Sequence, residues 1–192
     1  KENADGEDTE ENQEETVTVD FEALKKINPE IIAWIRIPDT KIDYPVVQGA
    51  DNEYYLNHTF KKTEHVAGSI FLDKDNSPDF SNRKSILYGH NMKDGSMFQG
   101  LHKYENEQYL ETHNKVYLYL PEGQTLTYSV IRCGYVNADS DTFWLGEPVE
   151  TRQLLLSTCG SDSSKRLVLF CELPEESEES ETNGEGISME VF

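Results

Sequence analysis

Two residues that could act together on a carbonyl group lie near the end of the chain. Cys159 follows the apolar run 154–156 and a Ser-Thr pair, and Arg166 precedes the apolar run 167–170. Apolar runs of this length, bounded by Gly and Ser, are typical of buried strands. If the two strands pair as a hairpin, a thiol and a permanent cation lie at the same end of a sheet. A nearby cation favours the thiolate, which is the reactive form of cysteine.

A candidate base, His90, ends a third apolar run that begins at Ser85. A thiol that attacks a carbonyl group needs activation, a proton donor for the leaving group and hydrogen-bond donors for the oxyanion. Cys159, His90 and Arg166 could supply these functions. Papain-like proteases place Cys before His, so the order found here is a different one. Taken alone, Cys159 could equally be a small buried hydrophobic residue, although a strand end beside a polar loop favours function.

The net charge of −20 is concentrated at the two ends of the chain. Residues 1–20 contain nine acidic side chains and one basic one, and residues 174–192 contain seven acidic side chains and no basic one. We expect disordered acidic tails at 1–19 and 174–192 around one domain at 20–173. No basic surface is evident, which argues against nucleic-acid binding.

The cysteine count and the hydropathy pattern exclude two classes of protein. Three cysteines (Cys133, Cys159 and Cys171) do not make a disulfide framework. Cys133 and Cys171 lie within apolar strands and are expected to be inert core thiols, although a bridge between them is conceivable outside the cell. No run approaches the ~20 apolar residues of a membrane helix.

The periodicity predicts a mainly β fold with short helices. We expect a helix at 20–27 capped by Asp20, a second helical turn started by Asn28-Pro29, and an edge or bulge at Pro45. Short helices are expected at 51–58, at 96–101 after a Ser96 cap, at 105–112 and near 151–154. The predicted strands are 35–37, 42–47, 68–73, 85–90, 115–120, 125–136, 154–159 and 166–170. Seven or eight such strands favour a closed or nearly closed barrel.

Four stretches of the chain resemble the class B sortases, the cysteine transpeptidases of Gram-positive cell surfaces. They are INPEIIAWIRIPDTKIDYPVVQGADNEYYLNHTF (27–60), AGSIFLDKDN (67–76), SILYGHNMKDGSMFQGLHKY (85–104) and LSTCGSDSSKRLVLF (156–170). The Y-G-H-N-M and S-T-C…R stretches are highly specific when they occur in one chain. The resemblance implies a closed eight-stranded β-barrel with an N-terminal helical extension and short peripheral helices.

The resemblance also implies roles for three residues. Cys159 matches the nucleophile, which attacks the carbonyl after the Thr of a C-terminal sorting motif. His90 matches the acid/base, and Arg166 matches the arginine that holds the substrate and stabilises the oxyanion. A peptidoglycan amine then resolves the thioester, or water does so slowly. The implied enzyme works without a cofactor or metal, as a monomer, on the outer face of the membrane. Its anchor would be an N-terminal helix absent from this chain.

Substrate-binding positions are implied as well. Tyr88, Ser157 and Thr158 match positions of the substrate groove or its neighbourhood, and Thr142 and Phe143 fall in the loop that contacts the sorting motif. Packing at the barrel rim is an equally good explanation for Tyr88 and Phe143. Only about 20 residues separate Val136 from Ser157. The substantial helix usual in this loop is therefore expected to be short or missing, which leaves the preferred motif open.

Other conspicuous residues have simpler explanations. The remaining histidines show no metal-ligand spacing. Asp73, Asp75, Asn76 and Asp79 lack the central Gly and closing Glu of an EF-hand, so a solvated loop is expected. Two rival functions stay open. An L,D-transpeptidase would carry an S-H-G-C-type motif, which is absent here, and a non-catalytic surface binding module would not need Cys159.

Overall fold

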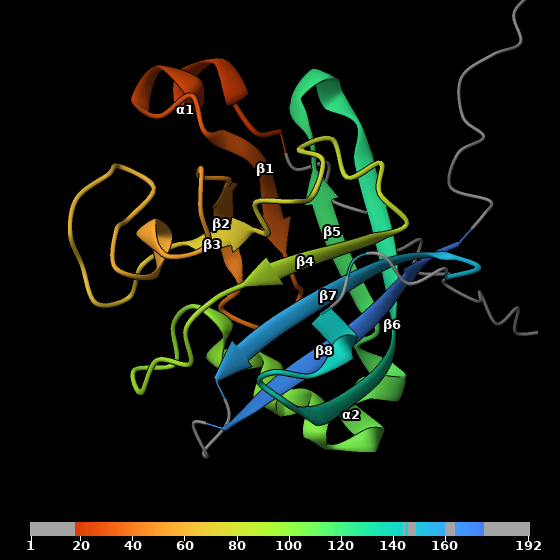
Figure 1. Cartoon of the computed structure of the whole chain (residues 1–192). Helices are drawn as coiled ribbons and strands as arrows, with labels where there is room; N and C mark the ends of the chain where they lie inside the picture. The colour runs from red at the N-terminus through yellow and green to blue at the C-terminus, as the bar shows by residue number, and fades with distance from the viewer. Residues whose placement is uncertain (1–17, 144, 146–148, 160–163, 175–192) are drawn as a thin grey trace, which may run out of the picture.

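Eight strands close into a barrel in the computed structural model, which describes residues 18–143, 145, 149–159 and 164–174 (Figure 1). The strands are β1 (Ile31–Arg36), β2 (Asp43–Val47), β3 (Ile70–Leu72), β4 (Lys84–Tyr88), β5 (Lys115–Tyr119), β6 (Thr125–Asn137), β7 (Arg152–Cys159) and β8 (Lys165–Leu173). The prediction of a closed eight-stranded barrel is confirmed.

The helices are short and lie around the barrel. They are the α-helices α1 (Phe21–Ile27) and α2 (Glu107–Thr112) and the 3₁₀ segments η1 (Tyr54–Leu56), η2 (Phe98–Glu105), η3 (Pro121–Gly123) and η4 (Asp141–Phe143). No helix within the described ranges has both the length and the hydropathy to span a bilayer. The expected acidic tails lie outside the described residues, apart from their inner ends.

The strand order around the barrel is β1-β2-β3-β4-β7-β8-β6-β5, and β5 returns to β1. Two of the neighbouring pairs are parallel, namely β2 with β3 and β4 with β7. The other pairs are antiparallel, including the hairpin of β7 and β8. In Figure 1 the arrows of β4 and β7 run side by side in the same direction. The chain after β4 therefore leaves the barrel beside the end of β7.

The residues of β7 are apolar without alternation because both faces of the strand are covered. Leu154 and Leu156 point into the barrel core, whereas Leu155 packs in an outer cluster with Ile86. Phe143 and Leu145, from the connection between β6 and β7, pack against that outer cluster. A strand buried on both faces needs apolar residues at successive positions. This explains why 154–156 is an uninterrupted leucine run.

The N-terminal helix forms as predicted. Asp20 caps α1 by accepting a hydrogen bond from the Ala23 amide at 2.9 Å. Phe21 and Leu24 pack against a small cluster that includes Tyr55 on the outside of the barrel. Ile27, which was expected on the same face, is 51% exposed. The helix therefore contributes two side chains to this cluster.

The second helical turn predicted after Asn28 is wrong. The Asn28 side chain is fully buried, and its Nδ2 donates to the Tyr55 hydroxyl at 2.8 Å and to the Phe60 carbonyl at 2.9 Å. Its Oδ1 accepts from the Glu30 amide at 3.0 Å. These bonds hold a tight turn, and β1 starts directly afterwards at Ile31. The pattern Asn-Pro-Glu therefore marks a turn tied to a distant loop.

Pro45 lies at a local edge of β2 as predicted, because it pairs with Trp34 of β1 while β3 pairs only with residues 46 and 47. Two smaller predictions differ from the structure. Ser96 does not cap η2, whose N-cap is Met97 with a positive φ of 55°. The helical turn expected near 151–154 is absent because β7 begins at Arg152. In each case strand pairing or the packing of the next segment overrides the local signal.

Candidate active site

Backbone pairing brings the three predicted catalytic residues to one end of the barrel. Within the parallel pair of β4 and β7, Tyr88 lies opposite Ser157. His90 and Cys159 each follow two residues later, and Cys159 lies opposite Arg166 in the antiparallel hairpin. The side chain of Cys159 lies outside what the structure describes, so its placement here rests on the backbone.

The backbone around His90 is fixed on both sides. The Gly89 amide donates to the Ser157 carbonyl at 3.1 Å, and the Phe98 amide donates to the His90 carbonyl at 2.9 Å. A Cβ atom at Gly89 would lie 2.5 Å from Ile70 Cδ1 and 2.7 Å from Phe98 Cδ2. Such distances are far below van der Waals contact, so only glycine fits between Tyr88 and His90.

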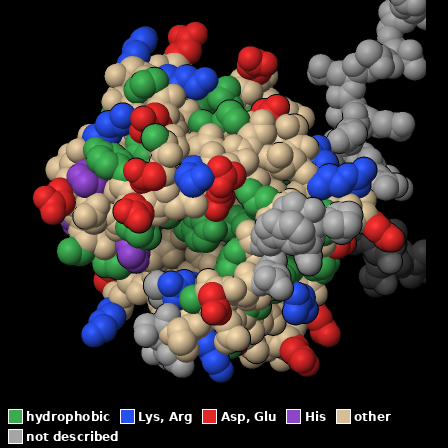
Figure 2. All heavy atoms as spheres, in the orientation of Figure 1, with side chains coloured by type: hydrophobic (Ala, Val, Ile, Leu, Met, Phe, Trp, Pro, Cys, Tyr) green, Lys and Arg blue, Asp and Glu red, His purple; other side chains and the backbone are tan. Residues whose placement is uncertain are grey.

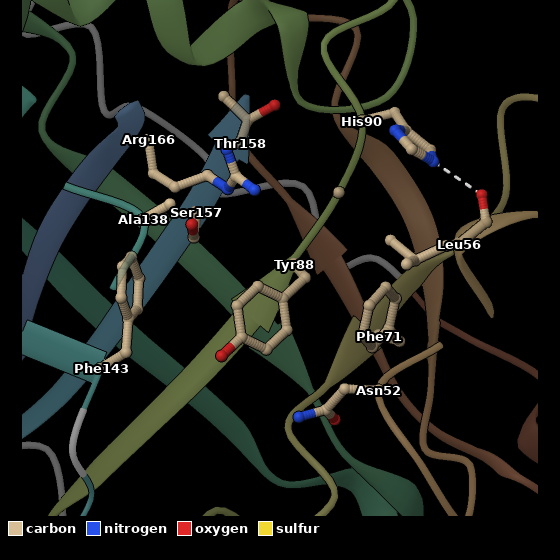
Figure 3. Close-up of a pocket in the computed structure, with 11 residues that line it drawn as sticks. Asn52, Leu56, Phe71, Tyr88, His90, Ala138, Phe143, Ser157, Thr158 and Arg166 are labelled. Carbon is tan, nitrogen blue, oxygen red and sulfur yellow. Dashed lines mark hydrogen bonds between the residues drawn. The ribbon is translucent and has the colours of Figure 1, made fainter. Parts of the chain in front are cut away.

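The imidazole ring of His90 is oriented by a carbonyl group. Its Nε2 lies 2.6 Å from the backbone oxygen of Leu56, the last residue of η1 (Figure 3). A carbonyl oxygen can only accept, so Nε2 carries the hydrogen, and Nδ1 is the basic nitrogen of the neutral ring. This contact fixes the tautomer of a half-buried histidine.

A pocket of about 270 Å³ lies beside these residues. Tyr88, Phe143, Ser157 and Thr158, all predicted from the sequence, line it together with His90 and Arg166. Sequence reasoning missed Asn52, Leu56, Phe71, Gly89 and Ala138. Asn52 and Leu56 fall within the stretch 27–60 that carried the resemblance, which was the available signal. In the space-filling view, hydrophobic side chains gather near the middle of this face and charged side chains surround them (Figure 2).

Thr142 is the predicted substrate-binding residue that does not line the pocket. Its backbone amide and its hydroxyl both bond to the Ser140 hydroxyl, at 3.2 and 3.0 Å. Its neighbour Phe143 reaches the pocket and lies 6.4 Å, centroid to centroid, from the Tyr88 ring. Within the described residues of the β6–β7 connection, the helical segment is the three-residue η4, in line with the expected short loop.

Two hydroxyl groups in the pocket wall are buried without a partner. Ser157 and Thr158 are 2% and 1% exposed, and neither Ser157 Oγ nor Thr158 Oγ1 has a hydrogen-bond partner within the described ranges. An unpaired buried hydroxyl costs about 1–3 kcal/mol. Both residues line the pocket, but their hydroxyl oxygens are buried in its wall.

Tyr88 lines the β4 side of the pocket, next to its strand partner Ser157 on β7. Its ring packs 5.3 Å from the Phe71 ring, centroid to centroid (Figure 3). Its hydroxyl donates to Asp73 Oδ2 at 2.9 Å. Burial is the main cause that raises the Tyr88 pKa, and the Asp73 carboxylate adds to it, while Arg166 acts in the opposite direction. Tyr88 is therefore a neutral hydrogen-bond donor at physiological pH. Arg166, half-buried at the start of β8, lies close enough to act on it electrostatically.

The other two cysteines are free, and their thiols are held in the protonated form. Burial raises the pKa of Cys133 to about 11, and it raises the pKa of the fully buried Cys171 further. Because the thiolate is the nucleophile, neither residue is suited to attack a carbonyl group. Cys171 is a core thiol as predicted, whereas Cys133 is half-buried and packs against the core.

Comparison with known proteins identifies the family. A model of the sortase domain matches residues 35–174. The chain belongs to the sortase family. Sortase B of Staphylococcus aureus is 30% identical to it over 187 residues, which cover 83% of this chain and 77% of that protein. Sortase B of Listeria monocytogenes is 49% identical over 90 residues, or 47% of this chain and 37% of that protein.

Solved structures agree with this assignment and with class B. Sortase B of Clostridium perfringens superposes with a TM-score of 0.71 at 29% identity, covering 81% of this chain and 100% of that chain. A Staphylococcus aureus sortase B–substrate complex superposes with a TM-score of 0.70 at 28% identity, covering 80% and 84%. The resemblance drawn from the four sequence stretches is confirmed.

Proposed function

We propose that this chain is a cysteine transpeptidase that cleaves a C-terminal sorting motif after its Thr and transfers the protein to a peptidoglycan amine. The proposal rests above all on the register that pairs β7 with both β4 and β8. That register gives Cys159, His90 and Arg166 neighbouring positions, although His90 and Arg166 are 76 positions apart in the sequence.

The first half-reaction forms a thioester. The Cys159 thiolate attacks the carbonyl carbon after Thr, and the electrons of the C=O bond move to oxygen. Arg166 donates hydrogen bonds to that oxyanion, a role that suits a planar guanidinium whose charge persists at any relevant pH. The oxyanion then re-forms the C=O bond, the C–N bond breaks, and the His90 imidazolium, which holds the proton taken from the Cys159 thiol, gives that proton to the leaving amine.

The second half-reaction returns the enzyme to its starting state. A peptidoglycan amine attacks the thioester carbonyl, and His90 takes its proton. The C–S bond breaks, and Cys159 leaves as the thiolate. Water in place of the amine gives slow hydrolysis. The contact of Nε2 with the Leu56 carbonyl leaves Nδ1 as the nitrogen for both transfers.

The pocket supports a peptide as the ligand. The rings of Phe71, Tyr88 and Phe143 offer an apolar surface, and Asn52 and Arg166 add polar side chains to the same lining. An extended peptide presents both apolar side chains and backbone polar groups. In this proposal the enzyme works as a monomer at the outer face of the cell membrane, on surface proteins as substrates, and it needs no metal or cofactor.

The test is intact-protein mass spectrometry after mixing with peptides of the N-P-x-T-N, S-P-x-T-G and L-P-x-T-G types. A thioester adduct should form with at least one peptide and disappear when a glycine-type amine is added. Cys159→Ala should form no adduct, whereas the matched variant Cys133→Ala should form it at the wild-type rate. An adduct that survives in Cys159→Ala would overturn the assignment of the nucleophile. If no peptide reacts although Cys159 is alkylated readily, the proposed substrate class is wrong.

A further inference from the structure

A buried carboxylate behind the pocket binds two side chains of its wall. Asp73 directly follows β3 and is 7% exposed. Its Oδ2 accepts hydrogen bonds from the Tyr88 hydroxyl and from Asn52 Nδ2, both at 2.9 Å. Its Oδ1 accepts from the Asp75 amide at 3.0 Å. The carboxylate therefore has three donors directed at two oxygens.

Asp73 itself is held in a fixed place. Its amide donates to the Ile86 carbonyl on β4 at 2.9 Å, and its carbonyl accepts from Gln48 Nε2 at 2.9 Å. Gln48 Nε2 also donates to the Asn76 carbonyl at 2.7 Å. The loop after β3 is thus bonded to β4 and to the residue that follows β2. A carboxylate anchored in this way is a rigid reference point for its partners.

Tyr88 and Asn52, whose side chains donate to Asp73, both line the pocket, whereas Asp73 does not. Figure 3 shows the Tyr88 ring and the Asn52 amide along the same side of the pocket, with Phe71 next to them. Asn52 Oδ1 accepts from the Lys74 amide at 2.8 Å, so both ends of that amide group are occupied. The remaining N–H of Asn52 and the face of the Tyr88 ring are what this wall can offer to a ligand.

We propose that Asp73 is a positioning residue for substrate binding, which holds the Tyr88 ring and the Asn52 amide in the geometry that receives the sorting motif. This inference rests on the proposed function, because it deepens the account of the same pocket. Asp73 touches neither the reacting atoms nor the pocket, so its effect passes through its two partners. The group that binds here should combine an apolar part, for the Tyr88 ring, with a carbonyl oxygen, for the Asn52 N–H.

Asparagine at position 73 cannot replace the carboxylate. An amide has one oxygen, whereas three donors face the two carboxylate oxygens. If the amide nitrogen takes the place of Oδ1, it meets the Asp75 N–H. If it takes the place of Oδ2, it meets the Asn52 N–H. The first arrangement sets two donors against each other in the loop that fixes position 73, and the second does so at Asn52 itself, so either one disturbs the hold on the pocket residues.

The kinetic test uses Asp73→Asn with a sorting-motif peptide that reacts with the wild type. We expect KM to rise about tenfold while kcat stays within about twofold, because Cys159, His90 and Arg166 keep their places. The alkylation rate of Cys159 by iodoacetamide should not change. Asp75→Asn makes the same substitution two positions away, at a side chain that is 67% exposed, and should leave both kinetic constants unchanged. An unchanged KM in Asp73→Asn overturns the inference.

A double variant tests whether Asp73 acts through Tyr88. Tyr88→Phe should raise KM about threefold with kcat unchanged. Asp73→Asn combined with Tyr88→Phe should raise KM no more than Asp73→Asn alone, since both act on the same hydrogen-bonded group. If the KM increase of the double variant equals the product of the two single increases, the inference is overturned. If Asp73→Asn does not fold, the KM of Tyr88→Phe is the test, and a wild-type KM in that variant counts against the inference.

A crystal structure of Asp73→Asn tests positioning without any substrate. The Tyr88 ring or the Asn52 amide should leave its place in the wild-type structure, while His90 keeps its contact with the Leu56 carbonyl. Unmoved side chains overturn the inference even if the peptides do not react. Conversely, a wild type that reacts with no peptide counts against the proposed function and leaves this structural result standing.

Discussion

The two walls of the pocket use their polar groups in opposite ways. On the side of β3 and β4, the Tyr88 hydroxyl and the Asn52 amide are both bonded to Asp73. On the side of β7, the buried hydroxyls of Ser157 and Thr158 have no partner in the part of the chain that the structure describes. The polar groups of the first wall are therefore fixed before a ligand arrives, whereas the second wall contains two buried hydroxyls that are unpaired within the described residues.

The two walls should contribute to the free energy of unfolding with opposite signs. A paired polar group in the first wall stabilises the fold, by about 0.5–1.5 kcal/mol for each hydrogen bond. An unpaired hydroxyl in the second wall destabilises it. Substitutions in the two walls should therefore change the free energy of unfolding with opposite signs.

The largest expected effect is that of substituting Arg166. This residue lines the pocket from β8, where it pairs with Cys159 at the end of β7. Arg166→Lys keeps the charge but loses the planar fork of donors, so kcat/KM should fall about 100-fold. Steady-state kinetics with a reactive sorting-motif peptide measure it. Arg132→Lys is the matched control, because the Arg132 guanidinium stacks 3.7 Å from the Phe170 ring centroid on β8, away from the pocket. Wild-type kinetics in Arg166→Lys would remove Arg166 from the oxyanion site.

The next effect distinguishes an unpaired hydroxyl in the pocket from one outside it. Ser157→Ala should raise the free energy of unfolding by about 1 kcal/mol and lower kcat/KM about tenfold. Ser85, on β4, also has a buried Oγ without a partner in the described ranges, but it does not line the pocket. Ser85→Ala should give the same gain in stability with unchanged kinetics. Equal kinetic losses in the two variants would show that the hydroxyl of Ser157 has no special role.

Tyr88→Phe should move stability in the other direction. Loss of the hydroxyl takes one donor from the buried Asp73, and the free energy of unfolding should fall by about 1 kcal/mol. Urea unfolding followed by circular dichroism measures the change. Tyr54→Phe is the control, because Tyr54 is 37% exposed and its hydroxyl has no partner among the residues described. A Tyr88→Phe protein as stable as the wild type would contradict the contrast between the walls.

The smallest effect is a dependence on alkaline pH. Burial raises the Tyr88 pKa above its ordinary value of about 10 in the folded state. The contribution of Tyr88 to stability is thus fully present below about pH 10 and is lost as pH rises through the folded pKa. Tyr128, whose pKa burial raises to about 12, acts with the same sign. Urea midpoints between about pH 8 and 11 should fall less steeply in Tyr88→Phe than in the wild type, and equal slopes would assign the effect to other tyrosines.

The hairpin of Cys159 and Arg166 could be predicted from the sequence because its signals are local. Two apolar runs joined by a short polar loop pair in the expected register. The position of His90 beside them could not be derived in this way. It depends on the parallel pairing of β4 with β7, two strands separated by most of the second half of the chain. The resemblance to sortases supplied that neighbourhood, and the structure gives its register.

Other features could not be predicted from the sequence because a long-range contact overrides the local pattern. Asn28-Pro29 has the residues of a helix start, yet the Asn28 amide is bonded to Tyr55 and Phe60. Asp73 looked like one of several acidic residues in a solvated loop, and only the fold shows that its carboxylate is buried beneath Tyr88. Residues whose partners come from distant segments carry no signal in their own sequence neighbourhood.

The parallel pairing of β4 with β7 also has a consequence for biosynthesis. Ribosomes release the N-terminal part of a chain first, and contacts between distant segments form late in folding. His90 leaves the ribosome well before Cys159 and Arg166, and β7 and β8 are the last two strands in chain order. A nascent or truncated chain that lacks them holds an imidazole without its thiol. The reactive centre is thus completed only when the barrel closes, so an unfinished chain cannot attack neighbouring peptides.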